Sequence, residues 1–142
     1  MSDFIEQAFP NLKDAGYQIT SPQNRKYNCI AWAVGDQSRW WQPEPSIFYW
    51  PAGVDREISV EAYVAAFAAV GYVECDGDQP EDGCEKIALY ALNNKPTHAA
   101  RQLNNGLWTS KLGQVEDVEH TLDGLVGNKY GTVIKFLKRP KP

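Results

Sequence analysis

Tyr27-Asn28-Cys29-Ile30-Ala31-Trp32-Ala33 is the stretch of sequence that decides the fold. A run with turn chemistry, Ser21-Pro22-Gln23-Asn24, leads into it. The apolar residues after Cys29 indicate the first turns of a buried helix. A thiol at a helix start lies near unpaired backbone N–H groups and the positive end of the helix dipole, which favour the thiolate. Cys29 is therefore the candidate nucleophile.

A candidate base for this thiol lies far downstream in the sequence. His98 opens a strand-like segment over residues 98–103, and Asn104-Asn105-Gly106 is a hairpin turn signal that returns the chain along residues 107–111. A cysteine nucleophile needs a base, normally histidine, and a polar group that orients the second nitrogen of the base. Ser110 on the return strand is the candidate for that third group.

Other residues are candidates for the remaining roles. An acyl-transfer site also needs donors for the oxyanion, and the N–H of Cys29 and the side-chain amide of Gln23 are the candidates. Asp117 and His120 lie in residues 115–125, for which the apolar spacing predicts a helix. If that helix packs under the hairpin, either residue replaces Ser110 as the third catalytic group.

The order of these parts resembles the papain-like cysteine hydrolases, above all the compact NlpC-type peptidoglycan endopeptidases and their amidase relatives. In that superfamily a cysteine starts a helix, a histidine starts a strand, and a polar third residue follows on the next strand. The resemblance puts Ser110 at the third position and Gln23 at the spacing of the oxyanion glutamine, whereas Asn28 stands where the family usually has Asp. The Asn-Cys-Ile-Ala-Trp-Ala run also resembles an uncharacterised set of small bacterial proteins.

The resemblance implies a cysteine peptidase or amidase that cleaves an amide or related acyl bond. The implied substrate is a peptide, a peptidoglycan fragment or a protein, and no cofactor or metal is expected. The implied fold is α+β and papain-like, with N-terminal helices and the Cys29 helix packed against an antiparallel sheet in a single domain over residues 1–142.

The pattern of the rest of the chain agrees with that class of fold. Apolar spacing predicts a helix over 2–9 that ends at Pro10, a helix over 29–35 closed by Gly35, and a helix over 59–70 capped by Ser59. Strands are predicted in the segments 17–20, 72–75, 86–91, 98–103, 107–111 and 131–137. Helices followed by a run of strands indicate an α+β protein with an antiparallel sheet.

Composition narrows the classes of partner and the compartment. The net charge of −4 argues against nucleic-acid binding, and no apolar run is long enough to span a membrane. The first residues lack the basic and apolar regions of a secretory signal, and the three cysteines suit a reducing compartment. We therefore expect a cytoplasmic protein, with signal-independent export as an effector as the alternative. The oligomeric state is not specified.

Two further readings rest on other parts of the chain. Trp40, Trp41 and Trp50 lie in a proline-rich stretch and are expected to wall a substrate groove, or else to fill the core. Surface exposure of Trp40 and Trp41 together with a buried Cys29 thiol would instead favour a catalytically inactive papain-like module that binds a protein partner through this Trp-rich loop. A third reading is a metal site of Cys75, Cys84 and His120, although ligands spaced two to four residues apart are missing.

Overall fold

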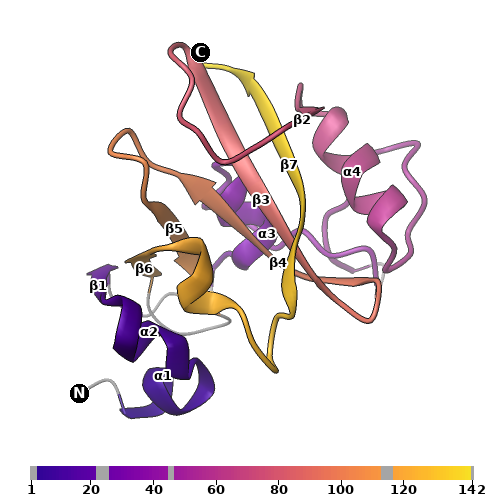
Figure 1. Ribbon diagram of the computed structural model, residues 1–142. Coiled ribbons are helices and arrows are strands. Elements are labelled where there is room, and N and C mark those ends of the chain that lie inside the picture. Colours follow the sequence, from indigo (N-terminus) through magenta and orange to yellow (C-terminus); the bar gives the residue numbers. More distant parts are fainter. Residues whose placement is uncertain (1–2, 22–25, 45–46, 113–116, 142) are drawn as a thin grey trace.

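The fold is a seven-stranded antiparallel sheet with a few short helices, in the order β1-β6-β5-β4-β3-β7-β2 (Figure 1). The structure is a computed structural model and describes residues 3–21, 26–44, 47–112 and 117–141. In those residues, no helix has the length and apolar character needed to cross a membrane. The elements are α1 (Asp3–Ala8), α2 (Pro10–Ala15), β1 (Tyr17–Ser21), α3 (Cys29–Ala33), α4 (Val60–Ala68), β2 (Val73–Cys75), β3 (Cys84–Leu92), β4 (Lys95–Gln102), β5 (Trp108–Lys111), β6 (Asp117–His120), the 3-10 helix η1 (Leu122–Leu125) and β7 (Thr132–Pro140).

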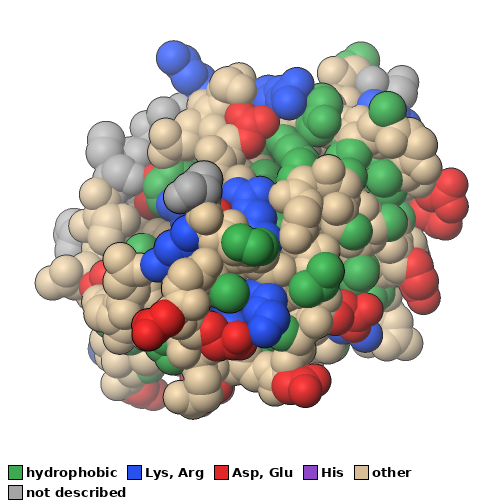
Figure 2. All heavy atoms as spheres, turned by 90° about the horizontal axis from the view of Figure 1, so that it is seen from above, with side chains coloured by type: hydrophobic (Ala, Val, Ile, Leu, Met, Phe, Trp, Pro, Cys, Tyr) green, Lys and Arg blue, Asp and Glu red, His purple; other side chains and the backbone are tan. Residues whose placement is uncertain are grey.

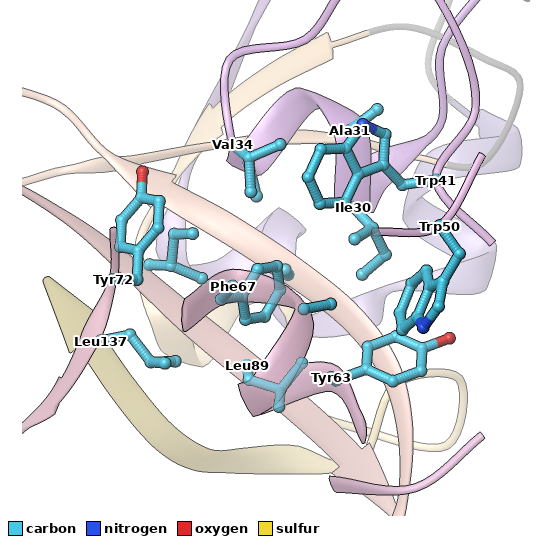
Figure 3. Packing of buried hydrophobic residues seen from close by; sticks show 14 of the residues in the cluster. Ile30, Ala31, Val34, Trp41, Trp50, Tyr63, Phe67, Tyr72, Leu89 and Leu137 are labelled. Carbon is cyan, nitrogen blue, oxygen red and sulfur yellow. The ribbon is translucent and has the colours of Figure 1, made fainter. Parts of the chain in front are cut away.

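The sheet separates two hydrophobic cores, because successive strand residues point to opposite faces. Ile87 and Leu89 of β3 pack with α3 and α4 on one side, which we call the α3 face. Ala88 and Tyr90 pack with α1, α2 and η1 on the other side, which we call the α2 face. Figure 3 shows part of the α3-face core, in which Phe67 of α4 lies near Leu89. Because both faces of the sheet are covered, the residues at the centre of β3 are apolar without interruption.

Helix α3 begins at Cys29 because the side chain of Asn28 caps it. Asn28 Oδ1 accepts hydrogen bonds from the backbone N–H groups of Ala31 and Trp41, both at 3.1 Å. Asn28 Nδ2 donates to the Trp41 carbonyl at 2.8 Å. One buried amide therefore starts the helix and also holds the segment around Trp41 against it.

Several predicted elements are confirmed. Helix α4 is capped by Ser59, whose Oγ accepts from the Ala62 N–H at 3.1 Å. The hairpin between β4 and β5 turns at Gly106, which has a φ of 87°, a value that favours glycine. The predicted strands correspond to β1, β2, β3, β4, β5 and β7.

One prediction about helices is wrong and one helix was missed. The helix predicted over 2–9 is α1, which ends before Pro10, and Pro10 begins the further helix α2, since the first turn of a helix has no use for the N–H that proline lacks. In place of the helix predicted over 115–125, the described residues form β6 and the 3-10 helix η1. Val118 points into the α2-face core from a strand, so the helical spacing of the apolar residues came from two different elements. Residues 113–116 lie outside the described part.

We predict that Asn28→Ala lowers the free energy of unfolding by about 3 kcal/mol. The substitution removes a helix cap and leaves buried backbone groups of Trp41 without partners. Urea denaturation followed by far-ultraviolet circular dichroism measures the change. Ser59→Ala, which removes only a cap bond, is the control and is expected to lose about 1 kcal/mol. Equal losses in the two variants would contradict the second role of Asn28.

Candidate active site

Cys29 lies at the start of α3, where the helix packs on β4 and β5. The Trp32 indole N–H donates to Thr109 Oγ1 at 3.3 Å and ties the helix to β5. The Cys29 side chain is half-buried and packs against the α3-face core. Burial raises the pKa of the Cys29 thiol to about 11, against the opposing effect of the backbone N–H groups of Ala99 and Ile30, of its own N–H and of the Lys111 charge.

This shift is opposite to the one that the helix start predicted. Helix α3 has only five residues, so its dipole is weak, and loss of water around the sulfur outweighs the nearby donors. The resting Cys29 side chain is therefore a neutral thiol near pH 7.

His98 is fully buried on the α2 face of β4. Its ring stacks on Tyr130, with centroids 4.1 Å apart and planes at 8°, and meets Tyr90 edge-on at 5.6 Å. Burial holds the pKa of His98 well below 6.5, so the imidazole is neutral. Nδ1 of His98 has no hydrogen-bond partner in the part of the chain that the structure describes.

Nε2 of His98 begins a chain of hydrogen bonds across three neighbouring strands. It lies 2.8 Å from Ser110 Oγ on β5, and Ser110 Oγ lies 2.7 Å from His120 Nε2 on β6. His120 Nδ1 lies 2.6 Å from the Thr121 carbonyl oxygen. The structure thus brings His98 and Ser110 together at the positions that the hairpin indicated. His120, the alternative candidate for the third catalytic group, does not replace Ser110 but is hydrogen-bonded behind it.

Both histidines are shielded from water. His98 and His120 are 0% and 1% exposed, and no histidine reaches the surface on the face drawn in Figure 2. Burial lowers the pKa of His120 to about 4. Every group in this series of hydrogen bonds, from the His98 ring to the Thr121 carbonyl, is therefore uncharged near neutral pH.

The thiol and the imidazole approach β4 from opposite sides. Cys29 packs with the core that contains Ala99, and the Ala99 N–H faces the thiol. His98, the preceding residue, points into the other core. Within the described residues no hydrogen bond joins the Cys29 sulfur to the His98 ring. The thiol and the imidazole therefore belong to different cores, with β4 between them.

A second polar group lies on the same face as Cys29, and of its members the sequence indicated only Asp117. Lys111 and Asp117 are paired in register on β5 and β6, and both are buried. The Tyr27 hydroxyl donates to Asp117 Oδ2 at 2.9 Å, and the Lys111 ammonium lies 5.2 Å from the centre of the Tyr27 ring. Because adjacent residues of a strand point to opposite faces of the sheet, the sequence could have placed Lys111 on the face opposite to Ser110. Asp117 is therefore a partner of Tyr27 and does not orient His98.

Two of the three tryptophans take the alternative place that was expected for them. Gln23 lies outside the described residues. Trp41 and Trp50 are 3% and 4% exposed and fill the α3-face core, against which Cys29 also packs (Figure 3). Trp40 is half-buried and stacks on Phe48 with ring centroids 5.4 Å apart.

The alternative metal site is not formed. Cys75 lies on β2 and His120 on β6, with four strands between them in the sheet order. Cys75 and Cys84 are free thiols. In the described ranges, no group of three or more His, Cys, Asp or Glu side chains is placed to hold a metal ion.

Comparison with known proteins identifies a family but no function. A family model described as a domain of unknown function (DUF7689) matches residues 18–138, which include Cys29, His98, Ser110 and His120. Neither the curated proteins nor the solved structures contain a significant match.

We predict that Cys29 reacts slowly with iodoacetamide near neutral pH. The raised pKa leaves about a hundredfold less thiolate at pH 8 than an accessible cysteine of ordinary pKa would have. In a Cys75→Ser/Cys84→Ser variant, the alkylation rate measured by mass spectrometry should rise about tenfold per pH unit up to pH 10. A plateau near pH 8.5 would contradict the buried, neutral thiol.

We also predict that acid destabilises the protein through its two histidines. The folded chain resists protonation of His98 and His120, whereas the unfolded chain takes up protons as the pH falls below about 6.5. The contribution of the two histidines to the free energy of unfolding is therefore fully present above that pH. It declines toward pH 4, by up to about 1.4 kcal/mol per pH unit for each histidine. Urea titrations of the wild type and His120→Gln measure the slopes, and the variant should lose less stability on acidification.

Proposed function

This chain belongs to DUF7689, a domain family of unknown function, and we propose that it is a cysteine hydrolase of the papain-like type. It cleaves an amide or related acyl bond, with Cys29 as nucleophile and His98 as general base and acid. A peptide, a peptidoglycan fragment or a protein is the class of substrate that the proposal takes from the resemblance.

The observation that carries the proposal is the environment of the His98 ring. One ring nitrogen, Nε2, is held by Ser110, and the other, Nδ1, has no partner among the described residues although it is buried. A buried polar atom without a partner is costly and is characteristic of functional sites. The adjacent residue, Ala99, offers its N–H to the Cys29 thiol, so the thiol meets β4 next to the residue that carries the unpartnered nitrogen.

The chemistry begins from two neutral groups. As the Cys29 sulfur adds to the substrate carbonyl carbon, its proton passes to His98 Nδ1, and the negative charge develops on the carbonyl oxygen. The N–H of Cys29 is a donor for that oxygen, with the Gln23 amide as the second. His98 then returns the proton to the leaving amine as the C–N bond breaks. A water molecule, deprotonated by the same nitrogen, hydrolyses the resulting thioester.

Closer approach of thiol and imidazole is part of this proposal. Catalytic hydrogen bonds are often long before substrate binds and shorten in the complex. Because the two groups pack in different cores, this approach requires the strand backbone at residues 98–99 to rearrange. A neutral resting pair also avoids holding a charge in the buried site until the substrate supplies an oxyanion.

The second candidate is a papain-like module that binds without turnover. The high pKa of the Cys29 thiol favours it, because a neutral buried thiol is a weak nucleophile. The core position of Trp41 and Trp50 argues against it, since these side chains were to provide its binding surface. We place either activity in a reducing cytoplasm, which the three free cysteines support.

We predict that p-nitrophenyl acetate acylates Cys29 and that the acyl group is then released. Intact-mass spectrometry of the Cys75→Ser/Cys84→Ser variant should detect one acetyl group, and nitrophenolate release should continue beyond the first turnover. Cys29→Ser and Cys29→Ala should abolish the modification, and His98→Gln should slow it by about a hundredfold or more. Acylation unchanged in His98→Gln, or no acylation of Cys29 at all, would favour the binding module.

A further inference from the structure

We propose that His120 and the backbone carbonyl of Thr121 are a positioning pair that determines which nitrogen of His98 carries the proton. The pair acts through the Ser110 hydroxyl and leaves a lone pair on His98 Nδ1, the nitrogen without a partner. The assignment of tautomers stands on the hydrogen bonds and on the neutrality of the buried histidines, and its importance for catalysis rests on the proposed function.

The Thr121 carbonyl determines the direction in which each hydrogen bond of the series is donated. A carbonyl oxygen only accepts hydrogen bonds, so His120 Nδ1, 2.6 Å away from it, must carry a proton. His120 is neutral near pH 7 because burial lowers its pKa to about 4. A neutral imidazole has a single N–H, so Nε2 of His120 holds a lone pair and is an acceptor.

The Ser110 hydroxyl passes this direction on to His98. Its one hydrogen is donated to the lone pair of His120 Nε2 at 2.7 Å. The serine oxygen is then the acceptor toward His98 Nε2 at 2.8 Å, so that nitrogen carries the proton. Neutral His98 has no second proton, and its Nδ1 is left with the lone pair that a general base requires.

The opposite arrangement is excluded by the same contacts. If Ser110 donated to His98 Nε2, it would have to accept from His120 Nε2, and His120 Nδ1 would then turn a lone pair toward the carbonyl of Thr121. Two acceptors at 2.6 Å in a buried site repel each other and leave both unsatisfied.

The Thr121 carbonyl is a fixed anchor. Thr121 is the N-cap residue of η1, and its Oγ1 and its carbonyl oxygen both lie within hydrogen-bond distance of the Gly124 N–H, at 3.3 and 3.2 Å. On the other side, β6 pairs with both β1 and β5, which places His120 beside Trp108 in register. Both the Thr121 carbonyl and the His120 backbone are therefore held in place.

The histidine content of the chain makes the proposal directly measurable. There are two histidines in the sequence, so ¹⁵N labelling of histidine yields four ring nitrogens to assign. Two-dimensional ¹H–¹⁵N correlation through long-range couplings distinguishes protonated from unprotonated ring nitrogens. At pH 7.5 we expect His98 to be protonated on Nε2 and His120 on Nδ1. A proton on Nδ1 of His98, or on Nε2 of His120, would overturn the proposal without any variant.

Two variants of His120 separate positioning from packing. His120→Gln keeps an amide oxygen to accept from Ser110 and an N–H to donate to the Thr121 carbonyl, so His98 should retain its proton on Nε2. His120→Phe keeps the ring volume but removes the acceptor, so the Ser110 hydroxyl becomes free to donate and His98 should shift its proton toward Nδ1. An unchanged His98 tautomer in the folded Phe variant would overturn the proposal. Ser110→Ala provides the same test should the Phe variant fail to fold.

Acylation by p-nitrophenyl acetate links the tautomer to the reaction. In a Cys75→Ser/Cys84→Ser background, His120→Phe should slow acylation of Cys29 about tenfold or more, and His120→Gln should restore most of the rate. Restoration of the rate without the expected tautomer would overturn the positioning role. Expected tautomers together with an inert Cys29 would leave the relay standing and instead reject the hydrolase function.

Discussion

Burial of β3 and β4 on both faces is the constraint on which the rest of the structure depends. Because successive residues of a strand point in opposite directions, neighbours in these strands enter different cores. Ala99 joins the core beneath α3, where Cys29 lies, and His98 joins the core beneath α2 and η1. The candidate site is therefore divided by the backbone of one strand, and each half takes its properties from a different core.

The two halves differ in what surrounds them but share an absence of charge on the reacting groups. On the α2 face, the carbonyl of Thr121 and two hydrogen-bonded side chains hold a neutral His98. On the α3 face, burial keeps the Cys29 thiol protonated in spite of the backbone donors around it. In a low-dielectric interior, charge is stabilised only where partners compensate for lost water. In the proposed reaction, the substrate carbonyl oxygen takes up the negative charge as the Cys29 sulfur adds to the carbon, and this drives transfer of the thiol proton.

Local hydrogen bonds decide where Cys29 stands. The amide of Asn28 serves the start of α3 and the backbone of Trp41 at once, and Trp32 anchors the same helix to Thr109. Buried Lys111 and Asp117 line the neighbouring strands of this face. The Lys111 charge lies close enough to lower the pKa of the Cys29 thiol, against the larger effect of burial.

The sequence by itself determined most of the elements and some of the pairing. The turn at Gly106, the cap at Ser59 and the start of α3 after Asn28 follow from local chemistry, and the hairpin from His98 to Ser110 predicted their contact. The helix expected around Val118 failed because apolar spacing does not show which element a residue belongs to. Only the tertiary structure decided the pKa of Cys29, the core position of Trp41 and Trp50, and the place of His120 in series behind Ser110. These properties depend on how much water each group loses and which partner it meets across the sheet, and both are set by residues distant in the chain.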